Sequence, residues 1–456
     1  MEGPRRVHFV SLGCPKNRVD SELMAGLVER DGAQLTADPE QADVIVVNTC
    51  AFLTSATSES IDTILQLAEQ KKHGRCSRLI VTGCMVQRYG DAGLLDGFPE
   101  VDAFLGTNEL PRIAEAVADV LPKRAYLSKG SHLYNAKDPR LPATRGASTY
   151  LKIAEGCNRT CSFCVIPSIR GPQASRPLND VVDEARTLVE SGNREIVLIA
   201  QDLTSYGIDF GNRHALEDLL IELNDIESLR WIRLMYCYPW NFTARLVSLI
   251  RDCERVLTYI DMPLQHVNER ILASMRRSVK RHQQRRLIEK LRAIDGMVLR
   301  TTLMVGYPGE TETEFNELCD WVRDVEFERL GGFAFSPEEG TPAAAFGEQI
   351  PDEIKTARLD QLMAIQQAIS LKKNRALLGR ELKVLVDGTS EEHEYVLEGR
   401  FYGQAPEVDG VVYLSQKEEH GDEPMSVRPG DFVDVVIEEA TEYDLKGVMV
   451  RPSPAE

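Results

Sequence analysis

The first part of the chain alternates largely apolar runs with segments of helical periodicity. Three of these runs are VHFVSL (7–12), DVIVVN (43–48) and RLIVTG (78–83), and none shows the in-and-out alternation of a half-exposed strand. Parallel strands that are covered by helices on both faces have this pattern. We therefore predict a doubly wound α/β domain over residues 1–121, followed by a polar, partly basic linker over residues 122–148.

Six further apolar runs each end in polar or glycine residues. They read TYLKIAEG, EIVLIAQD, WIRLMY, LTYIDMPLQ, VLRTTLMVGYPGE and GGFAFSPEEGT. Repeats of strand and helix predict a partial (β/α)6 barrel over residues 149–378, with chemistry at the carboxyl ends of its strands. Its last helix is expected at about residues 352–377. Short strands and turn residues over 379–456 predict a small antiparallel β-barrel of the OB type.

Composition indicates the cellular compartment in which the protein is expected. No apolar run approaches the roughly 18 residues that cross a bilayer, and the start of the chain lacks the pattern of a signal peptide. The ten cysteines are too sparse for a secreted disulfide scaffold, and six of them are regularly placed, which favours metal binding or catalysis. We expect a cytoplasmic protein with no membrane partner.

Charge is spread unevenly along the chain. The net charge is −18, and residues 381–456 carry 19 Asp and Glu against 6 Lys and Arg, a net of −13. Such a region should repel nucleic acid and attract a basic partner. An acidic surface that only aids solubility explains the charge equally well.

Three cysteines are concentrated in EGCNRTCSFCVIPSIRG, namely Cys157, Cys161 and Cys164. Three thiolates on a four-iron, four-sulfur cube leave one iron free to bind a small molecule. A zinc knuckle with a distant fourth ligand and three unrelated thiols are the alternatives. The CxxxCxxC spacing, with Phe163 before the last cysteine, resembles the radical S-adenosylmethionine superfamily.

Three more cysteines, Cys14, Cys50 and Cys84, each follow one of the first three predicted strands. The carboxyl ends of neighbouring parallel strands share one edge of a sheet, so these thiols should converge there. A second cluster with its own open iron fits that arrangement. For any one of these cysteines taken singly, a buried core residue is the better explanation, and it is the equivalent position of all three that favours the cluster. The remaining four, Cys76, Cys237, Cys253 and Cys319, are expected to be structural thiols.

Sequence motifs along essentially the whole chain resemble the methylthiotransferase family of radical S-adenosylmethionine enzymes. The motifs are SLGCPKNRVDSE, VVNTCAFLTSATSES, VTGCMVQRY, LKIAEGCNRTCSFCVIPSIRG, AQDLTSYG, MVGYPGETE, FSPEEGTPA and EGRFYGQAPEVDG. CPKNRVDSE and NTCAFLTSA are similar to the RimO branch, which modifies an aspartate of a ribosomal protein. The tRNA-modifying MiaB branch typically has glutamine and methionine after the first cysteine and a basic C-terminal barrel. The acidic C-terminal region here independently favours a basic ribosomal protein.

The resemblance implies a specific reaction. A methylthio group replaces hydrogen on the β-carbon of an aspartate in protein twelve of the small ribosomal subunit, free or assembled. Two [4Fe-4S] clusters are implied, one on Cys157, Cys161 and Cys164 and one on the other triad, Cys14, Cys50 and Cys84. S-adenosylmethionine serves as methyl donor and radical source, and the C-terminal domain is a TRAM barrel. An electron donor such as flavodoxin or ferredoxin is expected, DNA is not a partner, and no acid–base catalytic residue is assigned.

Contacts to S-adenosylmethionine are harder to place. Phe163 belongs to the cysteine motif, and Gln201 and Asp202 end the second barrel strand, so all three are candidates. Gly306 and Gly309 would let the backbone approach the cofactor, but a glycine after a strand is more often just a turn.

Three charged residues near these motifs have no assigned role. The register does not say whether Arg233 points into the barrel. Asp20 and Glu22 fit first-turn carboxylates of a helix.

Two other functions remain open. One is modification of tRNA adenosine by an enzyme of the same family, which would need salt-dependent tRNA binding. The other is a non-enzymatic iron–sulfur carrier or ribosome assembly factor, which would not cleave S-adenosylmethionine. No HExxH or GxxxxGK[ST] motif supports a metallohydrolase or a nucleoside triphosphatase.

Overall fold

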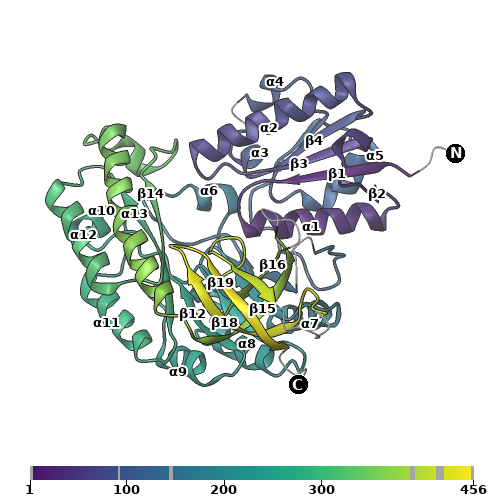
Figure 1. Ribbon diagram of the computed structural model, residues 1–456. Coiled ribbons are helices and arrows are strands. Elements are labelled where there is room, and N and C mark those ends of the chain that lie inside the picture. Colours follow the sequence, from purple (N-terminus) through teal and green to yellow (C-terminus); the bar gives the residue numbers. More distant parts are fainter. Residues whose placement is uncertain (1–3, 91–92, 143–146, 391–395, 417–425, 453–456) are drawn as a thin grey trace.

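A computed structural model describes residues 4–90, 93–142, 147–390, 396–416 and 426–452. It consists of an N-terminal α/β unit, a central open barrel and a C-terminal closed barrel (Figure 1). The fold class predicted from the sequence is confirmed. None of the helices in the described ranges combines the length and apolar composition that a membrane-spanning helix requires.

The N-terminal unit is a parallel six-stranded sheet flanked by helices. In spatial order its strands are β2 (Gln34–Leu35), β1 (Arg6–Ser11), β3 (Val44–Thr49), β4 (Arg78–Gly83), β5 (Ala103–Leu105) and β6 (Ala125–Tyr126). Its helices are α1 (Pro15–Arg30), α2 (Thr54–His73), α3 (Cys84–Tyr89), α4 (Leu94–Gly97) and α5 (Ile113–Ala118). Every residue of β3 is buried, which explains its continuous apolar sequence. The edge strand β6 lies inside the expected linker.

The central unit is a curved parallel sheet of six strands, one at each of the six predicted apolar runs. Its strands, in spatial order, are β14 (Arg329–Ala334), β13 (Val298–Val305), β12 (Val256–Asp261), β11 (Trp231–Leu234), β10 (Glu195–Ile199) and β7 (Ser148–Lys152). The helices that follow them are α6 (Ile166–Arg170), α7 (Leu178–Glu190), α8 (Ala215–Asn224), α9 (Ala244–Asp252), α10 (Glu269–Ser274), α11 (Arg281–Arg292), α12 (Glu312–Val325) and α13 (Asp352–Arg375). A short ladder of β8 (Ala154–Glu155) and β9 (Ala174–Ser175) precedes α7.

The C-terminal unit is a closed five-stranded barrel. Its strands are β15 (Glu381–Thr389), β16 (Leu397–Phe401), β17 (Val412–Gln416), β19 (Leu445–Pro452) and β18 (Phe432–Ala440), in spatial order. All neighbouring pairs are antiparallel except β17 and β19, which run parallel. Pairing of β15 with β18 closes the ring and leaves no free strand edge.

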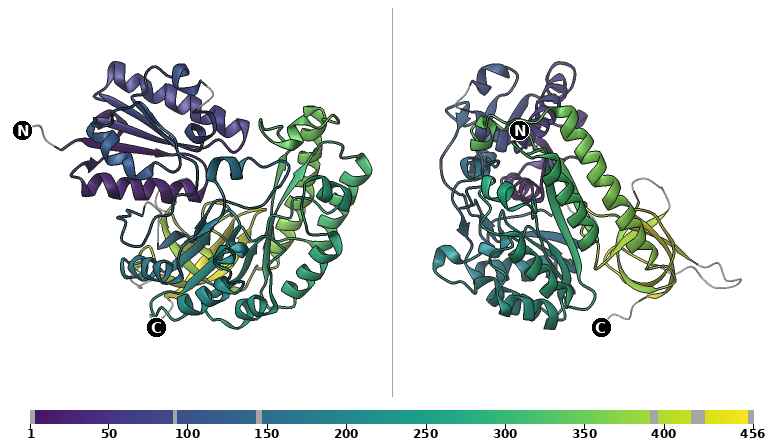
Figure 2. Two further views of the ribbon diagram at one scale, coloured as in Figure 1. Left: turned by 180° about the vertical axis from the view of Figure 1, so that it is seen from behind. Right: turned by 90° about the vertical axis from the view of Figure 1, so that its left-hand side faces the viewer.

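The two faces of the central sheet contact different partners. Leu151, Leu198 and Ile232 pack in one core with the outer helices. The alternating residues, such as Tyr150 and Val197, pack in another core with helix α1 and the C-terminal barrel. This follows from the two-residue repeat of a strand. The reverse views in Figures 1 and 2 show the C-terminal barrel on the side of the sheet opposite the outer helices.

A buried ion network joins the C-terminal barrel to the central sheet. Glu195, on β10, bonds Arg233 at 2.7 Å and Arg400, on β16, at 2.8 Å. Arg400 also donates hydrogen bonds from two nitrogens to the Asp387 carboxylate, at 2.7 and 2.9 Å, and one to the Ser148 hydroxyl at 2.7 Å. The direction of Arg233, which the sequence left open, is therefore toward the C-terminal barrel. Although burial would raise it, the two arginine charges lower the pKa of Glu195 to about 2.

We expect Glu195→Gln to lower the free energy of unfolding by about 3–5 kcal/mol at neutral pH, because it leaves the buried Arg233 without a charge partner and removes one of the two carboxylates that bind Arg400. A carboxylate whose pKa falls from 4.5 to about 2 on folding stabilises the protein above pH 4.5 and loses that effect as the pH falls toward 2. The difference between wild type and variant should therefore shrink between these pH values. Urea unfolding at pH 7 and pH 3 measures both, with the exposed Glu222→Gln as the control. An equal midpoint for Glu195→Gln and wild type at pH 7 would contradict this role.

Candidate active site

Cys14, Cys50 and Cys84 lie side by side because their strands are neighbours. Strand β3 pairs with β1 on one side and with β4 on the other. Cys14 caps α1, Cys50 follows β3, and Cys84 is the first residue of α3. Gly13 has a φ of +91°, and a Cβ there would lie 2.9 Å from the Cys50 sulfur. The chain therefore needs glycine at this turn to bring the two thiol loops together.

The side chain of Asn17 holds the three loops in place. Its Nδ2 donates to the carbonyl oxygens of Leu12 and Thr49, both at 2.9 Å, which joins the loops after β1 and β3. Its Oδ1 lies 3.6 Å from the Cys84 sulfur. The arrangement predicted for this triad, at the carboxyl edge of the sheet, is thus present in the fold.

The second triad lies in a single loop between β8 and α6. The amide of Cys157 donates to the carbonyl of Gly171 at 3.1 Å, and the amide of Cys164 donates to that of Cys161 at 3.2 Å. The Ser162 hydroxyl donates to the carbonyl of Ser274, at the end of α10, at 2.8 Å. These bonds fold the loop over the carboxyl end of the central sheet.

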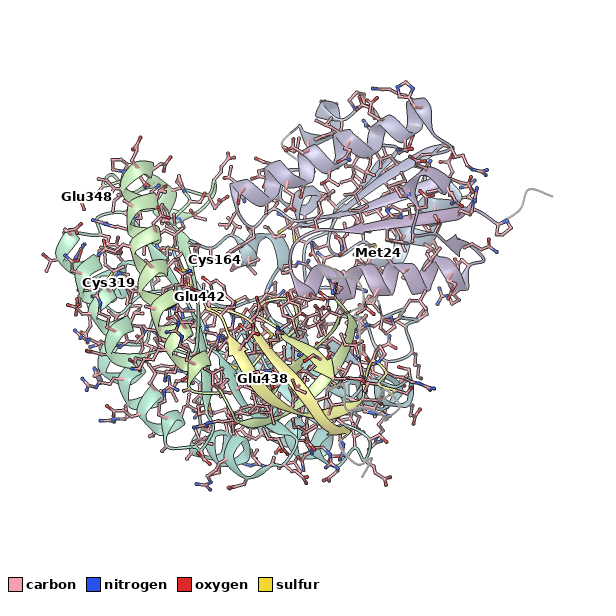
Figure 3. The ribbon with its side chains drawn as sticks, in the orientation of Figure 1. Met24, Cys164, Cys319, Glu348, Glu438 and Glu442 are labelled. Carbon is pink, nitrogen blue, oxygen red and sulfur yellow. The ribbon has the colours of Figure 1, made fainter. Side chains whose placement is uncertain are left out.

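All six of these sulfur-bearing residues line one cavity of ≈ 550 Å³. Three come from the N-terminal unit and three from the central barrel, so the cavity lies at the junction of the two. Figure 3 shows Cys164 at this junction. Phe163, Gln201 and Asp202 contribute to the same wall.

The chemistry of the donors fits iron–sulfur ligation. All ten cysteines of the chain lie in the described ranges and are free thiols. Thiolates are the ligands of such clusters, and a cube with three of them keeps an open iron. The described residues include no group of three or more Cys, His, Asp and Glu side chains placed to hold a single metal ion.

Burial keeps most of these thiols protonated when no metal is bound. It raises the pKa of Cys84 and of Cys164 to about 12 and that of Cys157 to about 11. It also raises the pKa of Cys50. Ligation must therefore release protons from buried groups, and a bound cation would oppose the burial effect.

Arg170 connects the two units beside the cavity. Its Nη1 bonds Asp20 of α1 at 2.7 Å and Glu155 of β8 at 3.2 Å. Its Nη2 donates to Asn17 and, at 3.3 Å, to the Cys84 sulfur.

Lys152 completes this network. It bonds both Asp20, at 2.5 Å, and Glu155, at 2.8 Å. Despite burial, the charges of Lys152 and Arg170 hold the pKa of Glu155 well below its usual range.

Comparison with known proteins matches each of the three structural units to a protein family or domain. Residues 6–106 match Uncharacterized protein family UPF0004, residues 151–322 the Radical SAM superfamily, and residues 378–450 the TRAM domain. The chain is 48% identical to the ribosomal protein uS12 methylthiotransferase RimO of Anaeromyxobacter sp. strain Fw109-5, over 98% of this chain and 94% of that one. It is 45% identical to RimO of Geobacter sulfurreducens, over 98% of both. The chain belongs to the RimO family. It is accordingly a radical S-adenosylmethionine methylthiotransferase, and its family implies a [4Fe-4S] cluster and S-adenosylmethionine as cofactors.

Solved structures agree on the fold. The radical S-adenosylmethionine methyltransferase TsrM of Kitasatospora setae, with tryptophan and a cofactor analogue bound, superposes with a TM-score of 0.55 at 14% identity, over 80% of this chain and 89% of that one. The cobalamin-dependent radical enzyme OxsB gives a TM-score of 0.52 at 11% identity, over 80% of this chain and 56% of that one. The predicted family, fold class and enzyme class are thus confirmed.

The candidate contacts to S-adenosylmethionine fall into two groups. Phe163, Gln201 and Asp202 line the cavity. Gln201 donates to Glu155, and its Oε1 has no hydrogen-bond partner among the described residues, whereas Asp202 already accepts from Arg159 at 2.8 Å.

Gly306 and Gly309 are not among the described residues that line the cavity. A Cβ on Gly306 would lie 2.4 Å from Lys355 of α13, and one on Gly309 would lie 2.5 Å from Glu348. Packing accounts for both glycines, and a role in cofactor binding stays a prediction.

Sequence patterns assigned no role to several other residues of this RimO-family site. Asp20 and Glu22 are not in the first turn of α1, because Asp20 joins the Arg170 network and Glu22 bonds Arg140 at 2.7 Å. Cys237, expected to be structural, is buried in the cavity wall. Arg170 was missed although it stands within the cysteine motif, because spacing alone cannot show which way a charge points.

In iron-free protein we expect Cys14 to be alkylated by iodoacetamide at least ten times faster than Cys84 at pH 8. Cys14 is exposed, whereas Cys84 is buried and its pKa of about 12 leaves roughly one thiol in 10⁴ ionised. Peptide mapping by mass spectrometry at successive times gives the order. Cys76, buried in the core of the N-terminal unit, is the slow reference, and urea-unfolded protein is the reference for full labelling. Equal rates for Cys14 and Cys84 would contradict the geometry of the triad.

Proposed function

We propose that this protein inserts a methylthio group at the β-carbon of an aspartate in ribosomal protein uS12, in the cytoplasm. The observation that carries the proposal is the single cavity lined by both cysteine triads. A reaction that must bring a carbon radical and a sulfur donor together needs both sites to face the same small volume. Family membership supports the substrate, because the relatives bear the name of uS12 methylthiotransferases.

Cys157, Cys161 and Cys164 would hold the cluster that the family implies, and Cys14, Cys50 and Cys84 would hold a second one. Bound there with S-adenosylmethionine, the two groups would supply radical chemistry and sulfur to the same cavity.

The protein itself provides shape, charge and exclusion of water. Arg170 stabilises the ligating form of Cys84 by its hydrogen bond, and Arg277 lies 4.0 Å from the Cys161 sulfur. Phe163 packs in an apolar cluster with Ile271 and Met304, which shields the loop from solvent. Gln201 lines the cavity, and its amide oxygen, which has no hydrogen-bond partner in the part of the chain that the structure describes, is the proposed contact for S-adenosylmethionine.

The acidic C-terminal barrel supports a basic partner rather than tRNA. Asp431, Glu438 and Glu439 on this barrel are exposed. Figure 3 labels Glu438, on strand β18, and Glu442, in the turn between β18 and β19. Ribosomal proteins that bind RNA carry the opposite charge, so this surface favours encounter with uS12, free or assembled. A soluble donor such as flavodoxin or ferredoxin would supply electrons.

Anaerobic reconstitution of the wild-type protein should give about eight irons and eight sulfides per chain, as two four-iron clusters require. Changing Cys14, Cys50 and Cys84 together to alanine should halve both counts while leaving reductive cleavage of S-adenosylmethionine intact. Sulfur insertion into uS12, followed by mass spectrometry, should then be lost. The matched control is Cys76→Ala, which lies outside the cavity and should keep all iron and all activity. Full iron content in the triple variant would refute the second cluster.

Binding of uS12 should depend strongly on salt, because attraction between a basic protein and an acidic barrel is screened within about 10 Å at 0.1 M salt. We expect the association rate constant to fall several-fold between 50 and 300 mM NaCl, and Glu438→Lys to lower it at low salt only. Surface plasmon resonance measures both, and total tRNA serves as the competing analyte. If the enzyme methylthiolated tRNA and left uS12 unmodified, tRNA would be the substrate in place of uS12.

A further inference from the structure

Positive side chains dominate the polar wall of the cavity. Those lining it are Lys16, Arg159, Arg170 and Arg277. Arg159 bonds the carboxylate of Asp202, Arg170 bonds two carboxylates, and Arg277 donates to a backbone carbonyl at 2.5 Å. Within the described ranges, Lys16 is the one cation of this wall that has neither a carboxylate nor a hydrogen-bond acceptor as partner. The cavity therefore holds a positive charge that the protein does not neutralise by contact.

Lys16 is held firmly in this position. It lies in the first turn of α1, two residues after Cys14, and only 7% of it is exposed. Its Nζ lies 2.9 Å from the centroid of the Tyr236 ring, which itself lines the cavity. An aromatic face compensates part of the cost of burying an ammonium group, but much less than an anion does. A lysine buried in this way is suited to receive an anion from outside the chain.

The position of Lys16 indicates what kind of anion fits. Because it stands between the Cys14 loop and the barrel wall, an anion bound to it lies inside the reaction space. The acidic side chain in that wall, Asp202, is already bound by Arg159. Asp261 and Glu155 also act on Lys16 by charge, but Arg300 bonds the first, and Lys152 and Arg170 bond the second. None of these carboxylates forms an ion pair with Lys16.

We propose that Lys16 binds the side-chain carboxylate of the target aspartate and so positions its β-carbon. This inference rests on the proposed function. The carboxylate of aspartate is bonded directly to the β-carbon, so fixing the carboxylate fixes the reacting carbon to within one bond length. An asparagine side chain has the same shape without the charge, and binds Lys16 more weakly. Lys16 thus makes the site specific for an acidic residue.

The test compares two enzymes with two substrates. Lys16→Met keeps the length of the side chain and removes its charge, whereas Lys16→Arg keeps the charge. Purified uS12 and a uS12 variant with asparagine at the target position are bound to reconstituted enzyme that carries S-adenosylmethionine, and the dissociation constants are measured by calorimetry. We expect Lys16→Met to bind uS12 about 10- to 100-fold more weakly, the usual loss for a hydrogen bond to a charged group. Lys16→Arg should recover most of the affinity.

Asparagine-containing uS12 is the decisive arm. Its affinity for wild type and for Lys16→Met should differ far less than that of uS12, because its amide carries no charge for Lys16 to bind. If Lys16 had only a structural role, Lys16→Met would weaken the binding of both substrates by the same factor, and that result overturns the inference. Lys290→Met, on the exposed face of α11, is the matched control and should change nothing.

Two further readouts separate the possible failures. Iron content and affinity for S-adenosylmethionine should be unchanged in Lys16→Met. A loss confined to S-adenosylmethionine would assign Lys16 to the carboxylate of that cofactor and overturn the proposal. If wild-type enzyme leaves uS12 unmodified, the proposed function fails and this inference fails with it. If wild type modifies uS12 and Lys16→Met binds and modifies it equally well, the inference alone fails.

Discussion

The network of Asp20, Lys152, Glu155 and Arg170 is the constraint on which the site depends. Of the six thiols in the two triads, three belong to one folding unit and three to another, so the separation of the triads is set by how the two units contact each other. These four charged side chains are buried and form ion pairs with one another. They restrict how the two units can pack, since any displacement would leave an unpaired charge in an apolar environment. Because Arg170 also reaches the Cys84 sulfur, the same group that joins the units belongs to one of the triads.

The C-terminal barrel contributes to the cavity as well as to the surface. It packs against the face of the central sheet that the outer helices leave uncovered. Glu407, in the loop after β16, has a φ of +66° and accepts a hydrogen bond from the Tyr150 hydroxyl at 3.2 Å. The next residue, Val408, lines the cavity. A loop held in an uncommon backbone conformation at this place is consistent with a shape requirement of the site.

Much of the architecture could be predicted because its causes are local. Continuous apolar runs such as residues 44–49 mark fully buried strands, and the cysteines that follow three of them share an edge because their strands are neighbours in the sheet. What escaped prediction depends on contacts between distant segments. The roles of Lys16 and Arg170 are set by α1 packing against the barrel. The direction of Arg233 is set by Glu195 and by the carbonyl oxygen of Tyr402, 169 residues away. Chain order carries no signal for such pairings. The role of Gly306 was open for the same reason, since Lys355 packs against it from α13.

Val408 has a consequence for how this architecture can vary. A domain at the end of a chain is commonly regarded as an exchangeable adaptor, replaced without effect on the chemistry upstream. Here one of its loops forms part of the inner wall, so a chimera that received the terminal domain of another family member would inherit a differently shaped chamber together with a new surface. Recognition of the substrate macromolecule and the shape of the cavity around the reacting atoms are therefore linked. The terminal domain and the two catalytic units must diversify together.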